Sequence, residues 1–226
     1  MNKYELHIHT AECDKAARVS AGEIVQLYKD AGYSGGVITD HYASMFFDWF
    51  SDELSDADHQ KTIERYLKGY YAARNEGEKF GFTVLCGAEV RLENTENDYL
   101  IYGLEERDYY NLPLLNKCKN AEELVKILPR KAIVVQAHPF RNEMTVCDIS
   151  LFFGIEGYNG CTECVRNKMA KLYAENYGKP LTSGSDFHER HHLARGGIKT
   201  EHKILTPDDL VNVLKSGEYA LIENGE

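Results

Sequence analysis

Histidine and carboxylate residues stand in short, regularly spaced pairs near both ends of the chain. His7 and His9 are separated by one residue, and so are Asp186 and His188. In an extended segment, residues i and i+2 point to the same side, so each pair can hold one ion with two side chains. Imidazole combined with carboxylate is a ligand set typical of zinc, manganese or iron.

Further residues of the same types lie between these pairs: Asp40, His41, Glu89, Glu105 and His138. Each alone is a weak signal, because histidines and carboxylates are also common in exposed strands and turns. Together, five of the nine histidines and at least four carboxylates exceed what one ion needs. We therefore expect more than one metal ion.

The segments that must position these side chains alternate in type. Strands are expected over 3–8, 36–39, 82–86, 99–102, 132–136, 154–158, 180–183 and 219–222. Helices are expected over 21–31, 56–80, 121–128, 163–177 and 207–215, with Ser20 and Thr206 as N-caps. Such alternation predicts an α/β fold with a mainly parallel sheet. The polar residues follow successive strand ends, and in a parallel barrel these ends open on one face.

The motifs, in this order, resemble those of the PHP family, the polymerase and histidinol phosphatase metal-dependent phosphoesterases. The resemblance runs from Leu6 to about Gly197. It rests on His7-Ile8-His9-Thr10 with Cys13-Asp14, Thr39-Asp40-His41, Gly87-Ala88-Glu89, Ala137-His138-Pro139 and Gly184-Ser185-Asp186-Phe187-His188. It implies that residues 1–226 form a single PHP domain, a distorted (β/α)7 barrel with a trinuclear metal cluster at the C-terminal strand ends.

The same resemblance implies how the ligands divide among the ions. The first ion would be held by His7, His9, Glu89 and Asp186; the second by Glu89 and His138; the third by Asp14, His41 and His188. The family that the chain resembles commonly has a histidine after the fourth strand to complete the second site, and Glu105 stands there instead. We expect Glu105 to be a ligand, a hard donor that favours manganese or iron over zinc. The alternative is a weak or absent second ion.

A cluster of two or three divalent ions predicts hydrolytic chemistry on phosphate. Such ions lower the pKa of a bound water from 15.7 to roughly 7 and stabilise charge on a phosphate. We expect hydrolysis of a small phosphomonoester, with histidinol phosphate the best-known substrate of the family that the chain resembles. Asp40 is a candidate for orienting His41 or for acid–base catalysis. Arg141 and Arg195 are candidates for binding phosphate, and Arg195 also for catalysis.

Two other functions stay open from the sequence alone. One is hydrolysis of a nucleotide, a phosphotyrosine or a single-stranded nucleic-acid end. The other is a non-catalytic metal-binding module. The 36 acidic and 26 basic residues give a net charge of −10, which argues against broad binding of nucleic acid.

Composition sets the remaining expectations. Hydrophobic residues make up 43% of the 226 and charged residues 27%, as in ordinary globular proteins. With no apolar run near the ~20 residues of a membrane helix and no apolar N-terminal segment, we expect a cytoplasmic protein without a membrane partner. The six cysteines should be free thiols, and Cys161 and Cys164 lack the second pair that a zinc site needs. The aromatic segment 42–50 fits a lid, core packing or a subunit contact, and the oligomeric state is open.

Overall fold

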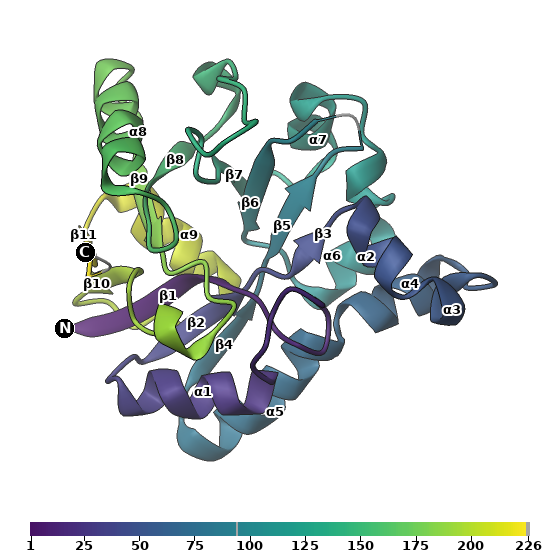
Figure 1. Cartoon of the computed structure of the whole chain (residues 1–226). Coiled ribbons are helices and arrows are strands. Elements are labelled where there is room, and N and C mark those ends of the chain that lie inside the picture. The colour runs from purple at the N-terminus through teal and green to yellow at the C-terminus, as the bar shows by residue number, and fades with distance from the viewer. Residues whose placement is uncertain (94, 225–226) are drawn as a thin grey trace.

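Two sheets carry the fold in the computed structural model, which describes residues 1–93 and 95–224. The first sheet runs in the order β11 (Ala220–Leu221), β10 (Ile198–Thr200), β1 (Asn2–Ile8), β2 (Gly35–Ile38) and β4 (Thr83–Cys86). The second runs in the order β3 (His41–Tyr42), β5 (Ala88–Arg91), β6 (Asp98–Tyr102), β7 (Ile133–Gln136), β8 (Gly154–Asn159) and β9 (Leu181–Gly184). Figure 1 shows the two sheets meeting at the centre of the molecule.

The two sheets are joined along two seams. At one seam, Gly87 alone separates β4 from β5, and its N–H donates to the Ile38 carbonyl at 2.9 Å. A Cβ at Gly87 would lie 2.7 Å from Val37 and 3.0 Å from the Ile101 oxygen, so the crossing requires glycine. At the other seam, Ile8 at the end of β1 forms a parallel bridge with Phe187, just beyond β9.

The expected α/β class is confirmed, but the sheets are less parallel than expected. β1 is parallel to β2, and β2 to β4; β7 is parallel to β8, and β8 to β9. In contrast, β6 is antiparallel to both of its neighbours, β5 and β7. The N-terminal end of β6 therefore lies beside the C-terminal ends of β5 and β7.

The helices follow the expected order, with more breaks than the sequence indicated. They are α1 (Ala21–Asp30), α2 (Ser44–Trp49), α3 (Ser51–Leu54), α4 (His59–Tyr66), α5 (Lys68–Phe80), α6 (Glu106–Asn111), α7 (Ala121–Ile127), α8 (Cys164–Asn176) and α9 (Pro207–Ser216). Short 3₁₀ turns cover Leu115–Lys117, Ile149–Leu151 and Arg190–His192. The N-caps at Ser20 and Thr206 are confirmed, since each accepts a backbone N–H three residues later. None of the described helices is long and apolar enough to cross a bilayer.

The predicted helix over 56–80 is two helices, α4 and α5, separated at Leu67. The second passes very close to the first motif. A Cβ at Gly69 would lie 2.0 Å from Thr10 Oγ1 and 2.6 Å from Asp40 Oδ2. The absence of a side chain at Gly69 lets α5 pack directly beneath the loops that follow β1 and β2.

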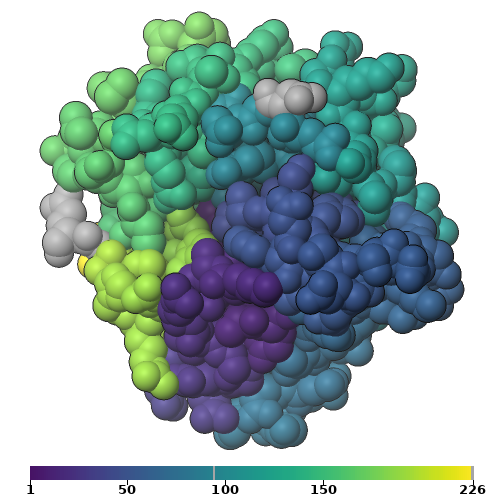
Figure 2. All heavy atoms as spheres, turned by 45° about the vertical axis from the view of Figure 1, so that its right-hand side comes forward, coloured from purple at the N-terminus to yellow at the C-terminus, as the bar shows by residue number. Residues whose placement is uncertain are grey.

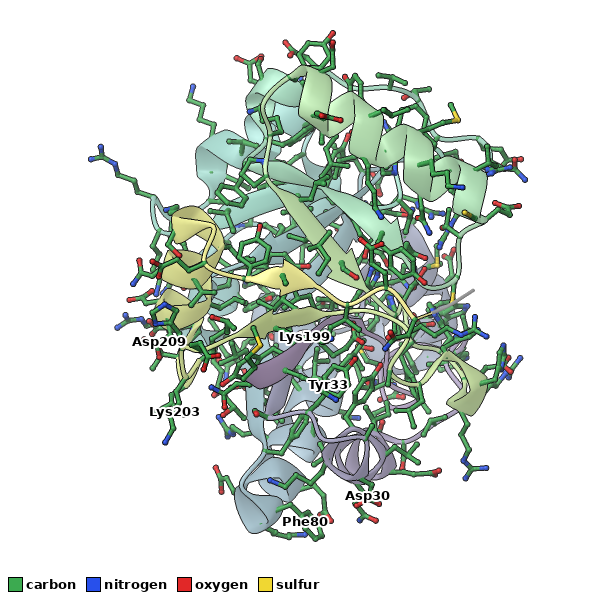
Figure 3. All side chains as sticks on the ribbon, turned by 90° about the vertical axis from the view of Figure 1, so that its left-hand side faces the viewer. Asp30, Tyr33, Phe80, Lys199, Lys203 and Asp209 are labelled. Carbon is green, nitrogen blue, oxygen red and sulfur yellow. The ribbon has the colours of Figure 1, made fainter. Side chains whose placement is uncertain are left out.

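The helices lie on the outside of the strands, and the two ends of the chain lie close together. In Figure 3, α8 lies across the top of the molecule and α1 lies below, where Asp30 is labelled. Figure 2 shows the purple N-terminal part beside the yellow-green C-terminal part on one face, consistent with the antiparallel pairing of β1 with β10.

Candidate metal centre

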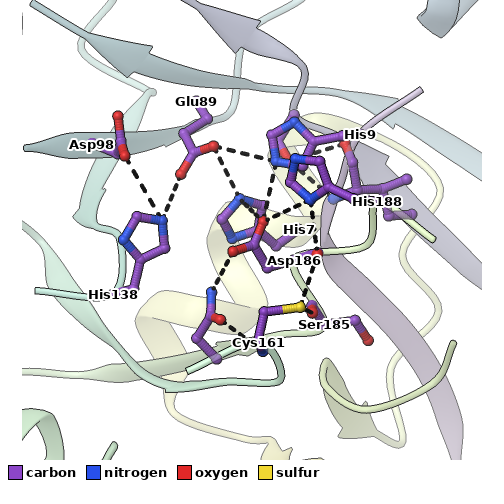
Figure 4. Close-up of polar contacts among 12 residues, drawn as sticks. His7, His9, Glu89, Asp98, His138, Cys161, Ser185, Asp186 and His188 are labelled. Atoms are coloured by element: carbon purple, nitrogen blue, oxygen red, sulfur yellow. Dashed lines mark hydrogen bonds and ion pairs between the residues drawn. The ribbon is translucent and has the colours of Figure 1, made fainter. Parts of the chain in front are cut away.

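The strand ends bring histidines and carboxylates into three overlapping groups. In each group, one ligand atom from every residue lies within 4.8 Å of the others. The groups are His7, His9, Glu89 and Asp186; His9, Asp14, His41 and His188; and Glu89, Asp98 and His138. His9 belongs to the first two and Glu89 to the first and third, so the groups form one continuous cluster (Figure 4).

The first group is fully buried and surrounds a small space with four donors. His7 Nε2 lies 3.3 Å from Glu89 Oε2 and 3.5 Å from Asp186 Oδ1. His9 Nε2 lies 3.2 Å and 3.4 Å from the same two oxygens. Because β1 is extended, His7 and His9 both point to this side of the strand, as the spacing predicted.

The second group surrounds Asp14, on the loop after β1. Asp14 Oδ2 makes a short contact with His41 Nδ1 and lies 3.1 Å from His9 Nδ1 and 3.9 Å from His188 Nε2. His41 and His188 are the more exposed members, at 12% and 18% of the side chain. This group therefore lies at the open edge of the cluster.

The third group differs from the expectation, because the structure does not bring Glu105 to the cluster. Glu105 precedes α6, 37% exposed, and pairs with Lys131 at 2.5 Å and Arg107 at 3.0 Å. Asp98 lies in this group instead. Its Oδ2 accepts from Arg91 Nη2 at 2.6 Å and lies 3.9 Å from His138 Nε2, which also faces Glu89 Oε1 at 2.9 Å. Because β6 runs antiparallel to β5 and β7, its first residue lies at the end of the sheet that holds the site. The residues that follow β6 lie at the other end of the strands.

The donor atoms of the cluster fit metal ions. Among the described residues, His7 Nε2, both ring nitrogens of His9 and His138 Nδ1 are buried without a hydrogen bond. A buried nitrogen without a hydrogen-bond partner lowers the stability of the fold unless another partner, such as a metal ion, binds it. Imidazole and carboxylate donors in groups of three or four suit divalent transition metals.

The pKa values of the cluster also favour ion binding. Burial lowers the pKa of His7, but the carboxylates of Glu89, Asp186 and Glu156 outweigh burial and hold that pKa well above its usual value. Burial raises the pKa of Asp186, but His7 and Arg141 outweigh it and hold that pKa well below normal. The His7 ring therefore keeps both of its protons beside the ionised carboxylates of Glu89 and Asp186. Cations would replace those protons, so binding should release protons and weaken as the pH falls.

Two carboxylates that the sequence analysis did not single out hold the ligands in place. Glu156 on β8 accepts from His7 Nδ1 at 2.8 Å and from the His138 backbone N–H at 3.0 Å. Outer partners of this kind fix the orientation of metal-binding histidines. Glu5 on β1 accepts from the backbone N–H groups of Leu6, His7 and Ser185 and from the hydroxyls of Tyr28 and Ser185. Their only sequence signal is a carboxylate inside an otherwise apolar strand.

Two of the expected ligands have a backbone conformation that non-glycine residues rarely adopt. His138 has φ of 25° and Asp186 has φ of 53°. Positive φ in such residues costs on the order of 1–3 kcal/mol and is found mainly at functional sites. At both positions the surrounding hydrogen bonds, to Glu156 and to Asn159, hold the strained residue.

The Asp40 side chain does not make the contact with His41 that the first of its two expected roles requires. Its carboxylate accepts from Thr10 N at 2.6 Å and Thr10 Oγ1 at 2.8 Å, and His41 is instead oriented by Asp14. Burial raises the pKa of Asp40 to about 7. Asp40 thus fixes the loop that carries Asp14 and makes no hydrogen bond to His41.

The two candidate arginines have different hydrogen-bond partners. Arg141 Nη2 donates to Asp186 Oδ2 at 2.5 Å and to Asn159 Oδ1 at 3.2 Å, at the edge of the first group. Arg195 Nη1 donates to the Gly160 carbonyl at 3.0 Å, one loop further out. The structure therefore brings Arg141 to the cluster and leaves Arg195 beside the loop that follows β8.

The aromatic segment 42–50 belongs mainly to the core. Tyr42, Phe46 and Phe50 are buried with Tyr66, and this packing accounts for most of the segment. Trp49 is the exception, since its ring is 6.5 Å from that of His41, edge-on. Trp49 therefore borders the open edge of the cluster.

The different positions of Asp98 and Glu105 give a direct test of the third group. Glu105→Ala should leave the metal content per chain unchanged, because the Glu105 side chain pairs with Lys131 and Arg107 and caps α6, and it contacts no residue of the cluster among the pairs described. Asp98→Asn, a change of one carboxylate oxygen to an amide, should lower the metal content measured by plasma mass spectrometry. Loss of metal in the Glu105 variant, with none in the Asp98 variant, would contradict this assignment.

Comparisons with known proteins point to one fold. A family model described as PHP-associated matches residues 165–219. No curated protein matches this sequence. A solved two-domain protein from Bacteroides vulgatus ATCC 8482, containing a predicted PHP-like metal-dependent phosphoesterase, aligns with a TM-score of 0.70 and 14% identity. The alignment covers 99% of this chain, which spans only 65% of that protein.

Two further structures share the fold at similar distance. An amidohydrolase from Chromobacterium violaceum, solved with bound sulfate and no metal, has a TM-score of 0.58 at 15% identity, covering 96% of this chain and 97% of its own. Endonuclease Q, solved with a 27-mer duplex substrate carrying an abasic lesion at the active site, has a TM-score of 0.59 at 14% identity. That alignment covers 95% of this chain and 56% of the endonuclease.

Proposed function

We propose, from the premise that this chain has the fold of the PHP-type metal-dependent phosphoesterases, that it hydrolyses a small phosphomonoester. The observation that carries the proposal is the continuous cluster of three ligand groups, linked through His9 and Glu89, with Arg141 at its edge. Separate ion sites would not need shared ligands. Shared ligands keep ions close enough to act on one phosphate.

The residues of the cluster and of its surroundings have separate roles in this reaction. Divalent ions, when bound, supply an activated water and neutralise charge on the phosphate. Glu89 belongs to two groups and would supply a carboxylate oxygen to an ion in each, while Glu156 orients the His7 ring and holds the backbone of His138. Arg141 bonds to Asp186 through Nη2, so its other guanidinium nitrogens are available to donate to phosphate oxygens.

Several finer features belong to the same proposal. We take the metal ligands to be His7, His9, Asp14, His41, Glu89, Asp98, His138, Asp186 and His188, holding two or three ions of manganese, iron or zinc. Asp98 in place of a neutral imidazole favours the harder metals. The distorted (β/α)7 barrel stays part of this proposal, and it is supported by the bridge of Ile8 with Phe187 that joins the two sheets at one seam. Arg195, beside Gly160, is placed to meet the outer part of the substrate rather than the reacting phosphate.

The proposal predicts that activity depends on bound divalent metal. Dialysis against a chelator should abolish hydrolysis of an aryl phosphate and of histidinol phosphate, and added manganese should restore it. Metal content measured before and after each step shows whether activity follows the amount of bound metal. Full activity in a chain shown to be free of metal would contradict the proposal.

The same assay separates the other substrate classes. A nucleoside monophosphate, a phosphotyrosine peptide and a 5′-phosphorylated oligonucleotide are compared with the small phosphomonoesters by kcat/KM. Preference for the oligonucleotide would assign the cluster to nucleic-acid hydrolysis. A chain that binds metal and hydrolyses none of these would instead be a metal-binding module.

A further inference from the structure

The outer face of α8 carries a row of exposed apolar side chains. Val165, Met169 and Leu172 are 63%, 46% and 65% exposed. On the opposite side of the same helix, Ala170 and Ala174 are buried among the residues next to β8. The helix is therefore apolar on two faces, and only one of them is covered by the described chain.

The spacing of these residues is that of a helix-pairing surface. Positions 165, 169, 172 and 176 are separated by four, three and four residues, the alternation that places side chains along one seam between two helices. Asn176 is the polar member of the row. Isolated exposed apolar residues are normal, but an uninterrupted row at this spacing is typical of a contact surface. Figures 1 and 3 both show α8 at the outside of the molecule.

Two opposite charges lie along one flank of the row. Lys168 and Glu175 are exposed and seven residues apart, which places them on the same side of the helix, about two turns from each other. Within the residues that the structure describes, neither forms an ion pair. On a single helix they are too far apart to meet, because neighbours on a helix face are three or four residues apart.

A second copy of α8 in antiparallel orientation satisfies both features at once. Antiparallel pairing about a two-fold axis places Met169 opposite Leu172 of the second copy, and Val165 opposite its Asn176. The same register brings Lys168 beside Glu175 of the second copy, and this pair occurs twice because the contact is symmetric. A parallel pairing about a two-fold axis would place the flank that carries Lys168 and Glu175 against the opposite flank of the second copy, so these two charges would not meet.

We propose that this chain forms a two-fold symmetric dimer through antiparallel pairing of α8 with α8 of a second copy. The paired surface is the row Val165, Met169 and Leu172, flanked by Lys168 and Glu175. Three apolar side chains per copy make a small contact, so the dimer forms and dissociates with concentration. The contact lies on the outside of the molecule and does not involve the metal ligands.

Sedimentation over a concentration series tests the pairing. The wild-type chain should shift from monomer to dimer as its concentration rises. Leu172→Glu places a charge in the apolar row and should raise the dissociation constant more than about tenfold. Leu205→Glu is the matched control, because Leu205 is equally exposed, at 64%, on the loop before α9, and it should leave the dissociation constant unchanged.

Charge reversal tests the orientation. Lys168→Glu or Glu175→Lys alone places like charges together and should weaken the dimer, whereas the double variant restores opposite charges and should recover it. Urea unfolding midpoints close to wild type would show that the variants are folded. A wild-type chain that stays monomeric at every soluble concentration overturns the proposal, and so does a dimer insensitive to Leu172→Glu. A dimer that the double reversal fails to recover overturns the antiparallel register.

Discussion

Replacing Asp186 by asparagine should lower the rate of phosphomonoester hydrolysis by more than about 100-fold while the chain remains folded. Asp186 Oδ1 faces His7, His9 and His188, so it contributes to the first group and borders the second. Changes to outer partners of metal ligands already cost roughly 10–100-fold in affinity or activity, and loss of a ligand should cost more. The asparagine keeps the size of the side chain and removes its charge.

The measurement is kcat/KM for an aryl phosphate together with metal content and circular dichroism. Asp208→Asn is the matched control, since Asp208 is 63% exposed in the first turn of α9 and far from the ligands in the fold. It should behave like the wild type. A folded, metal-loaded Asp186 variant with the wild-type rate would remove this residue from the site.

Replacing Glu5 by alanine should lower the free energy of unfolding by more than about 3 kcal/mol. The side chain accepts five hydrogen bonds in a fully buried position, from β1, α1 and the segment after β9. Each buried donor left without an acceptor costs about 1–3 kcal/mol, and the residual cavity adds to this loss. Because the free energy of unfolding of a native protein is only about 5–15 kcal/mol, the variant should be only marginally folded.

Urea unfolding of the metal-free chain gives the measurement. Glu201→Ala is the control, because Glu201 follows β10 with a side chain 78% exposed, and among the described residues that side chain makes one long contact, with the N-terminus at 3.8 Å. Its unfolding midpoint should match the wild type. If the Glu5 variant also kept the wild-type midpoint, the buried hydrogen bonds would contribute little to the fold.

Much of the site could be predicted because the C-terminal ends of parallel strands meet on one face of the fold. His7, His9, Glu89, His138 and Asp186 lie at or just after the C-terminal ends of β1, β4, β7 and β9, and simple spacing placed them together. The rule failed at β6. A strand that reverses direction brings its first residue, Asp98, to the site, and nothing in the local sequence of β6 reveals its direction.

The supporting residues were not predictable for a different reason. Glu5 and Glu156 lie inside strands, where a single carboxylate is normally read as a solvent-facing residue. Their function depends on partners far along the chain, 149 residues away for Glu156 and His7. Orienting His41 was one of the two roles expected for Asp40, but adjacent residues in an extended chain point to opposite sides.

The seam between the end of β1 and the segment after β9 has a consequence for how the chain is made. Glu5 and Ser185 are 180 residues apart, and their hydrogen bonds close this seam. During synthesis, His7 and His9 leave the ribosome early and wait for Asp186 and His188, so no group containing them is complete until most of the chain has emerged. Contacts of such long range are slow to form. The nascent chain therefore exposes unpaired imidazoles and strand edges for most of its synthesis, and metal capture becomes one of the last steps of folding.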